Sequence, residues 1–167
     1  MNRNWNKDWR KSIIVMSGGF DPIHKGHLRM FREASWLGHH VVIGLNSDEW
    51  LIRKKGKPFM EFEERKEIIE GFKYVNQVIP FDDSDDTARS LIHQVRATYN
   101  GGMFNHDWEG NNPTGRKDYE IYFANGGDQN NDSIPEVSIC KKLGIGLIEN
   151  LGDKIQSSSW LLKESDE

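Results

Sequence analysis

Two histidines in a His-x-x-His pattern, His24 and His27, lie in the stretch GGFDPIHKGHL, between a β-branched apolar run and an expected helix. Gly18 and Gly19 precede them and allow the backbone to approach a ligand closely. A helix that begins near Lys25 directs free N–H groups and the positive end of its dipole toward an anion. Since both imidazoles can donate hydrogen bonds to that anion, the stretch predicts a phosphate site that stabilises charge on a phosphoryl group.

Three other interpretations of the two histidines stay open. One histidine can pack in the core while the other is solvated, which is the usual outcome for an arbitrary pair. A hydrolase could bind a metal through Asp21, His24 and His27, although the spacing differs from His-x-x-x-His and the zincin glutamate is missing. A nucleotide-binding module without turnover is the third. Bound zinc would favour the hydrolase, and pyrophosphate release would exclude the non-catalytic module.

The elements that position the histidines follow from the hydrophobic pattern. Short apolar runs alternate with segments of helical period, which is typical of a parallel sheet with right-handed crossovers. Strands are expected at residues 13–16, 41–45, 78–81, 121–124 and 145–148. Helices are expected at residues 25–37, 61–72, 88–99 and 135–143. Gly38 is expected to end the first helix in a left-handed conformation. The pattern predicts an α/β fold, a Rossmann-like, doubly wound, five-stranded parallel sheet with flanking helices.

Polar clusters follow three of these strands. They read SGGFD, NSDE and NGGD, and each comes where its strand ends. In an open parallel sheet, ligands bind beyond the carboxyl ends of the strands. We therefore expect the three clusters to line one cleft.

Composition limits the classes of protein that the chain can belong to. The chain has 167 residues, which suits a single domain 1–167 with an N-terminal extension 1–10, a loop or lid 100–118 and a polar tail 163–167. Its net charge of -4 gives no basic field for nucleic acid or an anionic membrane. No apolar run approaches the roughly 20 residues of a membrane span. With a single cysteine, Cys140, and no signal-peptide core at the start, a cytoplasmic location is expected.

The stretch GGFDPIHKGHL resembles the HxGH signature of the cytidylyltransferase-like nucleotidyltransferases, within the HIGH-motif superfamily. The likeness continues through NSDEWLIRKKGKPFMEFEERKEIIEG, which is similar to glycerol-3-phosphate cytidylyltransferases and heptose-phosphate adenylyltransferases. It resumes at FANGGD and ends at KIQSSSWLL. The resemblance implies transfer of CMP or AMP from CTP or ATP to a small phosphorylated alcohol or sugar. It further implies direct in-line attack on the α-phosphate with release of pyrophosphate, Mg²⁺ or another divalent cation that offsets charge, and a homodimer.

The resemblance also implies roles for individual residues. The catalytic residues would be His24, His27 and Lys55, with Lys55 reaching the α-phosphate or the incoming phosphate. The nucleotide would bind to Gly19, Phe20, Asp21, Gly126, Gly127, Asp128, Lys154, Ser157, Ser158 and Ser159. The acceptor would bind to Asp48, Lys57 and Arg65. Asp21 is also a candidate Mg²⁺ ligand, although the triphosphate itself is expected to carry the cation.

Each of these roles has a structural alternative. The basic residues of RKKGKP can form an ordinary solvated loop. Arg65 shares a helix face with Ile68, Ile69 and Phe72, so a buried ion pair is as consistent with the pattern as ligand contact. The three serines can cap a helix, and Asp128 can be a turn residue. Lys154 in place of an arginine, and GGD without a second acid, favour ATP over CTP. The match DWEG at residues 107–110 is interpreted as a chance similarity.

Overall fold

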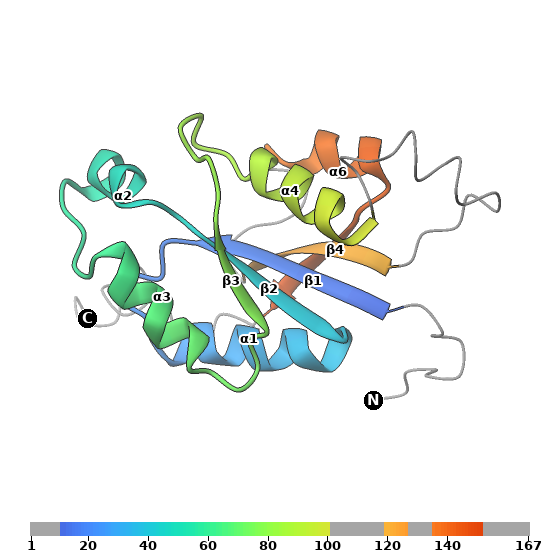
Figure 1. The fold of residues 1–167 in the computed structure, drawn as a ribbon, viewed down its shortest axis with the longest axis horizontal. Coiled ribbons are helices and arrows are strands. Elements are labelled where there is room, and N and C mark those ends of the chain that lie inside the picture. The colour runs from blue at the N-terminus through green and yellow to red at the C-terminus, as the bar shows by residue number, and fades with distance from the viewer. Residues whose placement is uncertain (1–10, 101–118, 127–134, 152–167) are drawn as a thin grey trace, which may run out of the picture.

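A single parallel sheet organises the part of the chain that the computed structural model describes, which is residues 11–100, 119–126 and 135–151 (Figure 1). Its strands lie in the spatial order β3-β2-β1-β4-β5. The strands are β1 (Lys11–Gly18), β2 (His40–Leu45), β3 (Gln77–Pro80), β4 (Tyr119–Gly126) and β5 (Gly146–Leu151). The helices are α1 (Lys25–Leu37), α2 (Asp48–Lys55), α3 (Phe62–Glu70), α4 (Arg89–Asn100) and α6 (Val137–Leu143). The predicted five-stranded α/β fold is confirmed.

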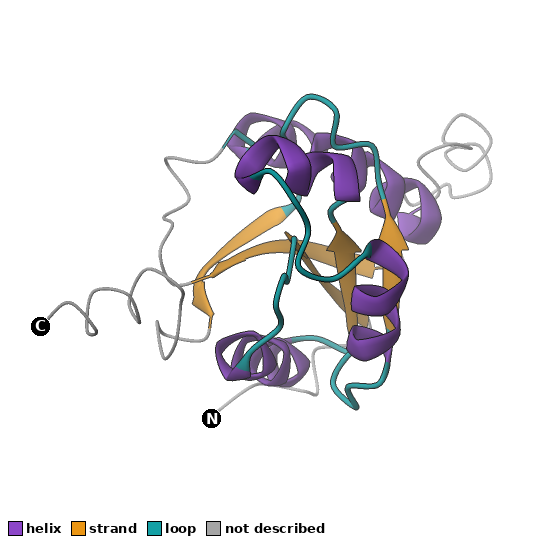
Figure 2. Cartoon of the chain, turned by 90° about the vertical axis from the view of Figure 1, so that its left-hand side faces the viewer, coloured by secondary structure: helices purple, strands orange, loops and turns teal. Residues whose placement is uncertain are grey.

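Helices cover both faces of the sheet, with α1 and α3 on one side and α4 and α6 on the other (Figures 1 and 2). Side chains of β1 alternate between the two sides, as the pleat requires. Ile13 and Val15 pack in the cluster with α4 and α6, whereas Ile14 and Met16 pack in the cluster with α1 and α3. All four are at most 1% exposed, which explains why β1 reads as a continuous apolar run.

The strand order reverses between β1 and β4. From β1 the chain moves outward through β2 to β3, and then α4 returns it across the sheet to β4 on the other side of β1. Where the connections from two adjacent strands run in opposite directions, a crevice forms at the carboxyl ends of these strands. The GGFD turn follows β1 at this point, so the topology places the two histidines where a doubly wound sheet binds its ligand.

Gly38 ends α1, but its conformation differs from the prediction. Its backbone is extended, with φ -136° and ψ 165°, instead of left-handed. The chain enters β2 at once, because His39 donates its backbone N–H to the carbonyl of Ser12 at 2.9 Å. Glycine is needed there for space, since a Cβ would lie 2.6 Å from a side-chain carbon of Ile14.

The helix α2 was not predicted. The basic stretch after NSDE was interpreted as a loop, yet Asp48–Lys55 is helical and contains two of its lysines. Ser47 caps the helix by accepting a hydrogen bond from the backbone of Trp50, and Gly56 ends it with φ 90°. Acidic residues in the first turn and basic residues in the last turn suit the helix dipole. The residues described contain no helix that is long and apolar enough to cross a membrane.

Gly44 on β2 offers a test of the packing between β2 and α4. A Cβ at this position would lie 2.3 Å from Cδ2 of Leu91, which is fully buried. We expect Gly44→Ala to lower the free energy of unfolding by about 1–3 kcal/mol, the usual effect of overpacking a core. Urea unfolding measures the change. Gly71→Ala is the control, since Gly71 has φ -77° and a Cβ there would lie 3.3 Å from its nearest neighbour. Equal stability of the two variants would contradict this packing.

Candidate active site

The turn after β1 has no room for a side chain at Gly19. A Cβ there would lie 2.9 Å from Cδ2 of Leu51 and 3.2 Å from the indole of Trp50. Phe20 follows with φ 50°, a conformation that non-glycine residues seldom adopt. Its ring is buried and meets the imidazole of His27 edge-on, with ring centroids 4.9 Å apart. The turn is therefore shaped by α2 on one side and by the histidines on the other.

The two histidines lie together at the N-terminus of α1. His24 is the N-cap, and its Nδ1 accepts a hydrogen bond from the backbone N–H of Gly26 at 3.0 Å. His27 reaches back, and its Nδ1 accepts from the backbone N–H of His24 at 3.2 Å. Their rings stack with centroids 3.8 Å apart. The backbone thus fixes both rings, and the predicted pairing of the two imidazoles is what the structure shows.

These hydrogen bonds select one tautomer for each ring. A nitrogen that accepts from a backbone N–H carries no proton, so a neutral His24 or His27 bears its proton on Nε2. Burial, and then the neighbouring His24, lower the pKa of His27 from 6.5 to about 3. Burial also lowers the pKa of His24. The pair therefore offers two neutral N–H donors at neutral pH, so a contribution from protonated His27 is not expected in the ligand-free chain.

This protonation state can be measured directly. Without ligand, we expect the ring of His27 to stay neutral, with its proton on Nε2, from pH 8 down to pH 5. Because its pKa in the folded chain is about 3 and the ordinary value is 6.5, the unfolded chain binds the proton first as the pH falls. The contribution of His27 to stability is therefore complete above pH 6.5 and is lost between there and pH 3. Nitrogen-15 NMR of the imidazoles reports the tautomer, and a transition near pH 6.5 at His27 would contradict the assignment.

Asp21 is fully engaged by its neighbours. Its Oδ2 accepts from the backbone N–H of Phe59 at 2.6 Å and pairs with Nζ of Lys55 at 2.7 Å, while its Oδ1 accepts from the N–H of Met60 at 2.7 Å. Burial raises the pKa of this carboxyl, but the hydrogen bonds from Lys55, Phe59 and Met60 outweigh burial and hold the pKa below its usual value. Asp21 joins the histidine turn to residues 55–60.

The three lysines of the basic stretch lie in different surroundings. Nζ of Lys55 contacts both the carboxylate and the backbone carbonyl of Asp21, each at 2.7 Å. Lys54 places its Nζ 4.6 Å from the centroid of the Trp50 ring. Lys57 is exposed in the loop after α2. Within the ranges that the structure describes, neither Lys54 nor Lys57 forms an ion pair, so the lysine predicted to be catalytic is the one held by an acidic partner.

Arg65 is buried on α3, where it joins four segments. Its Nη1 donates to the carbonyls of Gly19 and Asn46, each at 2.9 Å, and its Nε donates to the carbonyl of Met60 at 2.9 Å. Its Nη2 pairs with Oδ1 of Asp48 at 2.7 Å. The side chain of Arg65 has no exposed surface, whereas that of Asp48 is 31% exposed. Of the two interpretations of Arg65, the structure contains the buried ion pair.

The remaining predicted site residues lie beyond the described ranges. They are Gly127, Asp128, Lys154, Ser157, Ser158 and Ser159, together with the loop 101–118 and its DWEG match. Gly126 is the last residue of β4, and nothing beyond its backbone is described. The roles assigned to Gly126 and to the residues beyond the described ranges stay predictions.

Sequence reasoning missed Asp83, which is buried and hydrogen-bonded to the NSD segment. It lies in the acidic stretch DDSDD, residues 82–86, which precedes α4, where negative charge suits the start of a helix and by itself indicates no further role. The signal available in the sequence was position, because DDSDD follows β3 at the same edge of the sheet where NSD follows β2. Among the residues that the structure describes, no three His, Cys, Asp or Glu side chains lie close enough together to hold a metal ion.

The chain is similar in sequence to known cytidylyltransferases. It is 32% identical over 98 residues to glycerol-3-phosphate cytidylyltransferase of Bacillus subtilis, a match that covers 58% of this chain and 73% of that protein. It is 32% identical over 87 residues to the bifunctional protein HldE of Coxiella burnetii, covering 51% of this chain and 18% of that one.

The fold is similar to that of a solved lipopolysaccharide core biosynthesis protein from Thermoplasma volcanium. The TM-score is 0.58 at 16% identity, and the match covers 84% of this chain and 96% of the other. The cytidylyltransferase-like family matches residues 15–138, from β1 into α6, and so includes the turn, the histidines and α2. By this match, which spans more than half of the chain, the chain belongs to the cytidylyltransferase-like family of nucleotidyltransferases.

Proposed function

We propose that this protein transfers CMP or AMP from CTP or ATP to a small phosphorylated alcohol or sugar. A phosphate oxygen of the acceptor attacks the α-phosphorus, the bond to the bridging oxygen breaks, and pyrophosphate leaves with the electron pair. The observation that carries the proposal is the stacked histidine pair, with both Nε2 donors available at the N-terminus of α1. No side chain needs to form a covalent intermediate in this reaction.

The histidines stabilise the charge that develops during transfer. Their Nε2–H groups donate to the non-bridging oxygens of the triphosphate, and the positive end of the α1 dipole adds to the attraction. The backbone N–H groups of Gly26 and His27 are already engaged by His24 and are not needed as donors. Because the backbone fixes both rings before the substrate binds, little reorganisation is required in the transition state. Gly19 and Phe20 shape the turn beside the triphosphate, and Gly126 ends the strand next to it.

Residues outside the described ranges complete the proposed nucleotide site. We assign contacts with the base or ribose to Gly127 and Asp128, and contacts with the phosphates to Lys154 and the three serines, Ser157, Ser158 and Ser159. These assignments are supported by the resemblance of their motifs alone.

The acceptor phosphate is proposed to bind beside α2. Lys57 and Asp48 are the proposed acceptor contacts, since Lys57 is exposed and Asp48 is only partly covered by Arg65. Nζ of Lys55 uses two of its three N–H donors on the carbonyl and the carboxylate of Asp21, which leaves the third for a phosphate. Arg65 is proposed to orient Asp48 and the turn, with its donors already directed at carbonyls and a carboxylate.

Mg²⁺ is proposed to arrive with the triphosphate. The cation keeps several waters and binds through substrate phosphates with one or two carboxylates at most. The side chain of Asp21 is only 1% exposed, and both of its oxygens already accept hydrogen bonds from Phe59, Met60 and Lys55, so its carboxylate is not open to a further ligand in this conformation. No step of the proposed reaction depends on a protein-bound metal, and the same geometry gives no support to a metal-dependent hydrolase.

A pyrophosphate-release screen tests the function. CTP, ATP, GTP and UTP are each combined with glycerol phosphate, sugar phosphates, phosphocholine and phosphoethanolamine in the presence of Mg²⁺. We expect release with CTP or ATP and one acceptor class, and no release without acceptor. Binding of a nucleotide without release in any combination would support the non-catalytic module instead. The homodimer and the cytoplasmic location stay predictions.

A further inference from the structure

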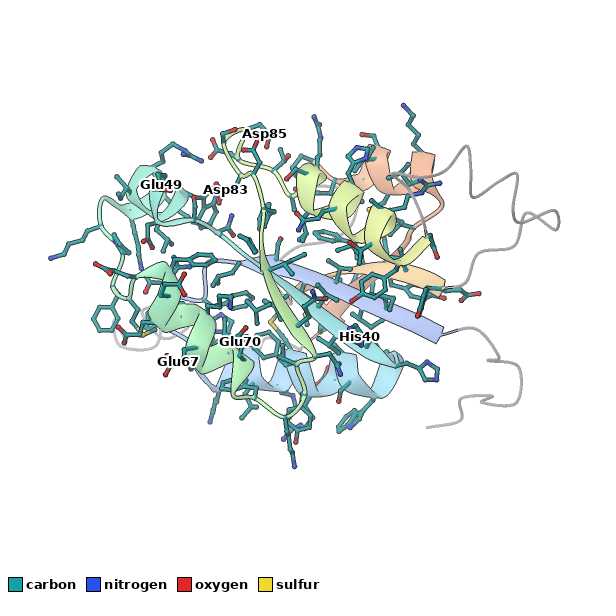
Figure 3. The ribbon with its side chains drawn as sticks, viewed as in Figure 1. His40, Glu49, Glu67, Glu70, Asp83 and Asp85 are labelled. Carbon is teal, nitrogen blue, oxygen red and sulfur yellow. The ribbon has the colours of Figure 1, made fainter. Side chains whose placement is uncertain are left out.

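The loop between β3 and α4 contains a carboxylate that the proposed reaction does not use. Asp83 is 5% exposed, and it accepts three hydrogen bonds from the segment that joins β2 to α2. Its Oδ2 accepts from Nδ2 of Asn46 at 3.0 Å and from the backbone N–H of Ser47 at 2.8 Å, and its Oδ1 accepts from Oγ of Ser47 at 2.8 Å. Figure 3 shows Asp83 on the side of the loop next to α2 and Asp85 at the outer end of the loop.

A buried carboxylate loses the hydration of its charge, which costs free energy. It is tolerated only where donors satisfy it, and such donors must keep a defined geometry. All three donors to Asp83 are neutral groups, and they belong to two consecutive residues. The contact therefore fixes the direction in which the chain leaves β2, which an apolar side chain of the same size would not do.

The direction of the chain at Ser47 sets the position of α2. Oγ of Ser47 donates to Asp83 and accepts from the backbone N–H of Trp50 at 3.1 Å, so the same hydroxyl caps the helix. Arg53, one helical turn further on, donates from Nη2 to the backbone carbonyl of Asp83 at 2.8 Å. A helix of 8 residues is marginal by itself and needs such tertiary contacts.

We infer that Asp83 is a positioning residue. By holding Asn46 and Ser47 it fixes the N-terminus of α2, and α2 in turn places Lys55 beside the histidine turn, where it contacts Asp21. The structural part of this inference stands on the described contacts alone. Its kinetic consequence rests on the proposed function.

Hydrogen exchange followed by mass spectrometry tests the structural part without any substrate. In Asp83→Ala we expect amides of α2 to exchange about fivefold faster or more, the factor that accompanies loss of a helix cap, while β1 and β4 keep their protection. Asp83→Asn keeps one acceptor oxygen and is expected to exchange at an intermediate rate. Asp82→Asn is the matched control, because the Asp82 carboxylate is exposed and contacts only Ser84 within the described ranges. Unchanged exchange of α2 in Asp83→Ala would overturn the inference.

A second variant separates positioning from a general loss of stability. Since the Ser47 hydroxyl both donates to Asp83 and caps α2, Ser47→Ala and Asp83→Ala are expected to be less than additive in their effects on exchange. Fully additive effects would show that Asp83 does not act through the Ser47 hydroxyl. If Asp83→Ala instead loses protection throughout the sheet, its role is global stability and the inference is wrong.

Steady-state pyrophosphate release tests the consequence at the site. With the donor and acceptor found in the screen, we expect Asp83→Ala to lose about tenfold or more in kcat/KM well below its melting temperature, as misplaced binding groups do. Asp82→Asn should match the parent. A parent chain that releases no pyrophosphate would refute the proposed function while the exchange data still decide the role of Asp83. Normal kcat/KM in Asp83→Ala would overturn the kinetic part.

Discussion

Replacing either histidine of the pair by asparagine is expected to reduce turnover about 100- to 1000-fold, as the loss of one preorganised transition-state donor does. Asparagine is the informative substitution because its side-chain oxygen can take the place of Nδ1 and accept the same backbone hydrogen bond. His24→Asn therefore keeps the helix cap on Gly26, and His27→Asn keeps the contact with the backbone of His24. The Nε2–H donor is lost together with the ring contacts of the replaced imidazole, and thermal melting reports the cost of the latter.

Pyrophosphate release at saturating nucleotide measures the effect, and circular dichroism with thermal melting verifies the fold. His93→Asn on the exposed side of α4 is the control and should turn over normally. Because the two rings stack and act on the same phosphates, the double variant is expected to lose less than the product of the single effects. Normal turnover in both single variants would show that the proposed mechanism is wrong.

Replacing Arg65 by methionine is expected to destabilise the fold by about 3–5 kcal/mol, the usual cost of removing one partner from a buried charged pair. The substitution leaves the carbonyls of Gly19, Asn46 and Met60 without this donor and the Asp48 carboxylate without its counter-ion. Since Asp48 is 31% exposed, water can solvate it in part, which favours the lower end of the range. Urea unfolding measures the change.

Two further variants test whether the several contacts of the Arg65 guanidinium, and not its positive charge alone, stabilise the fold. Arg65→Lys keeps the charge but has no planar fork to reach several acceptors at once, so an intermediate loss is expected. Lys66→Met is the control on the same helix, because Lys66 pairs with Glu70 on the surface, where ion pairs add little to stability. If Arg65→Met unfolds at the same urea concentration as Lys66→Met, the four contacts of Arg65 do not support the fold.

The sequence by itself determined the fold class and the place of the histidine pair. Alternation of apolar runs and helical periods is a local property, and it predicted all five strands because each contains a short apolar run. The HKGH stretch could be placed at the turn between β1 and α1, since a strand precedes it and a helix follows it directly. The ends of these elements shifted by a few residues, which does not change which strand the site follows.

Only the tertiary structure decided how the charged side chains pair. Lys55 meets Asp21, Arg65 meets Asp48, and Asp83 meets Ser47 across separate segments, which no local pattern encodes. The helix α2 escaped prediction because 8 residues with mixed polarity give a weak periodic signal. Its stability comes from contacts with other loops. Gly38 was assigned a left-handed cap from its position alone, whereas the close approach of Ile14 required an extended glycine.

The sequence and the tertiary structure each determined part of the chemistry of the two histidines. Their residue types and spacing indicated a phosphate site, because imidazoles at a helix N-terminus suit an anion. Their tautomer and charge depended on burial and on which backbone N–H each Nδ1 accepts from, and both follow from packing. The sequence supplied the donors, and the folded chain determined that they act as neutral, oriented N–H groups.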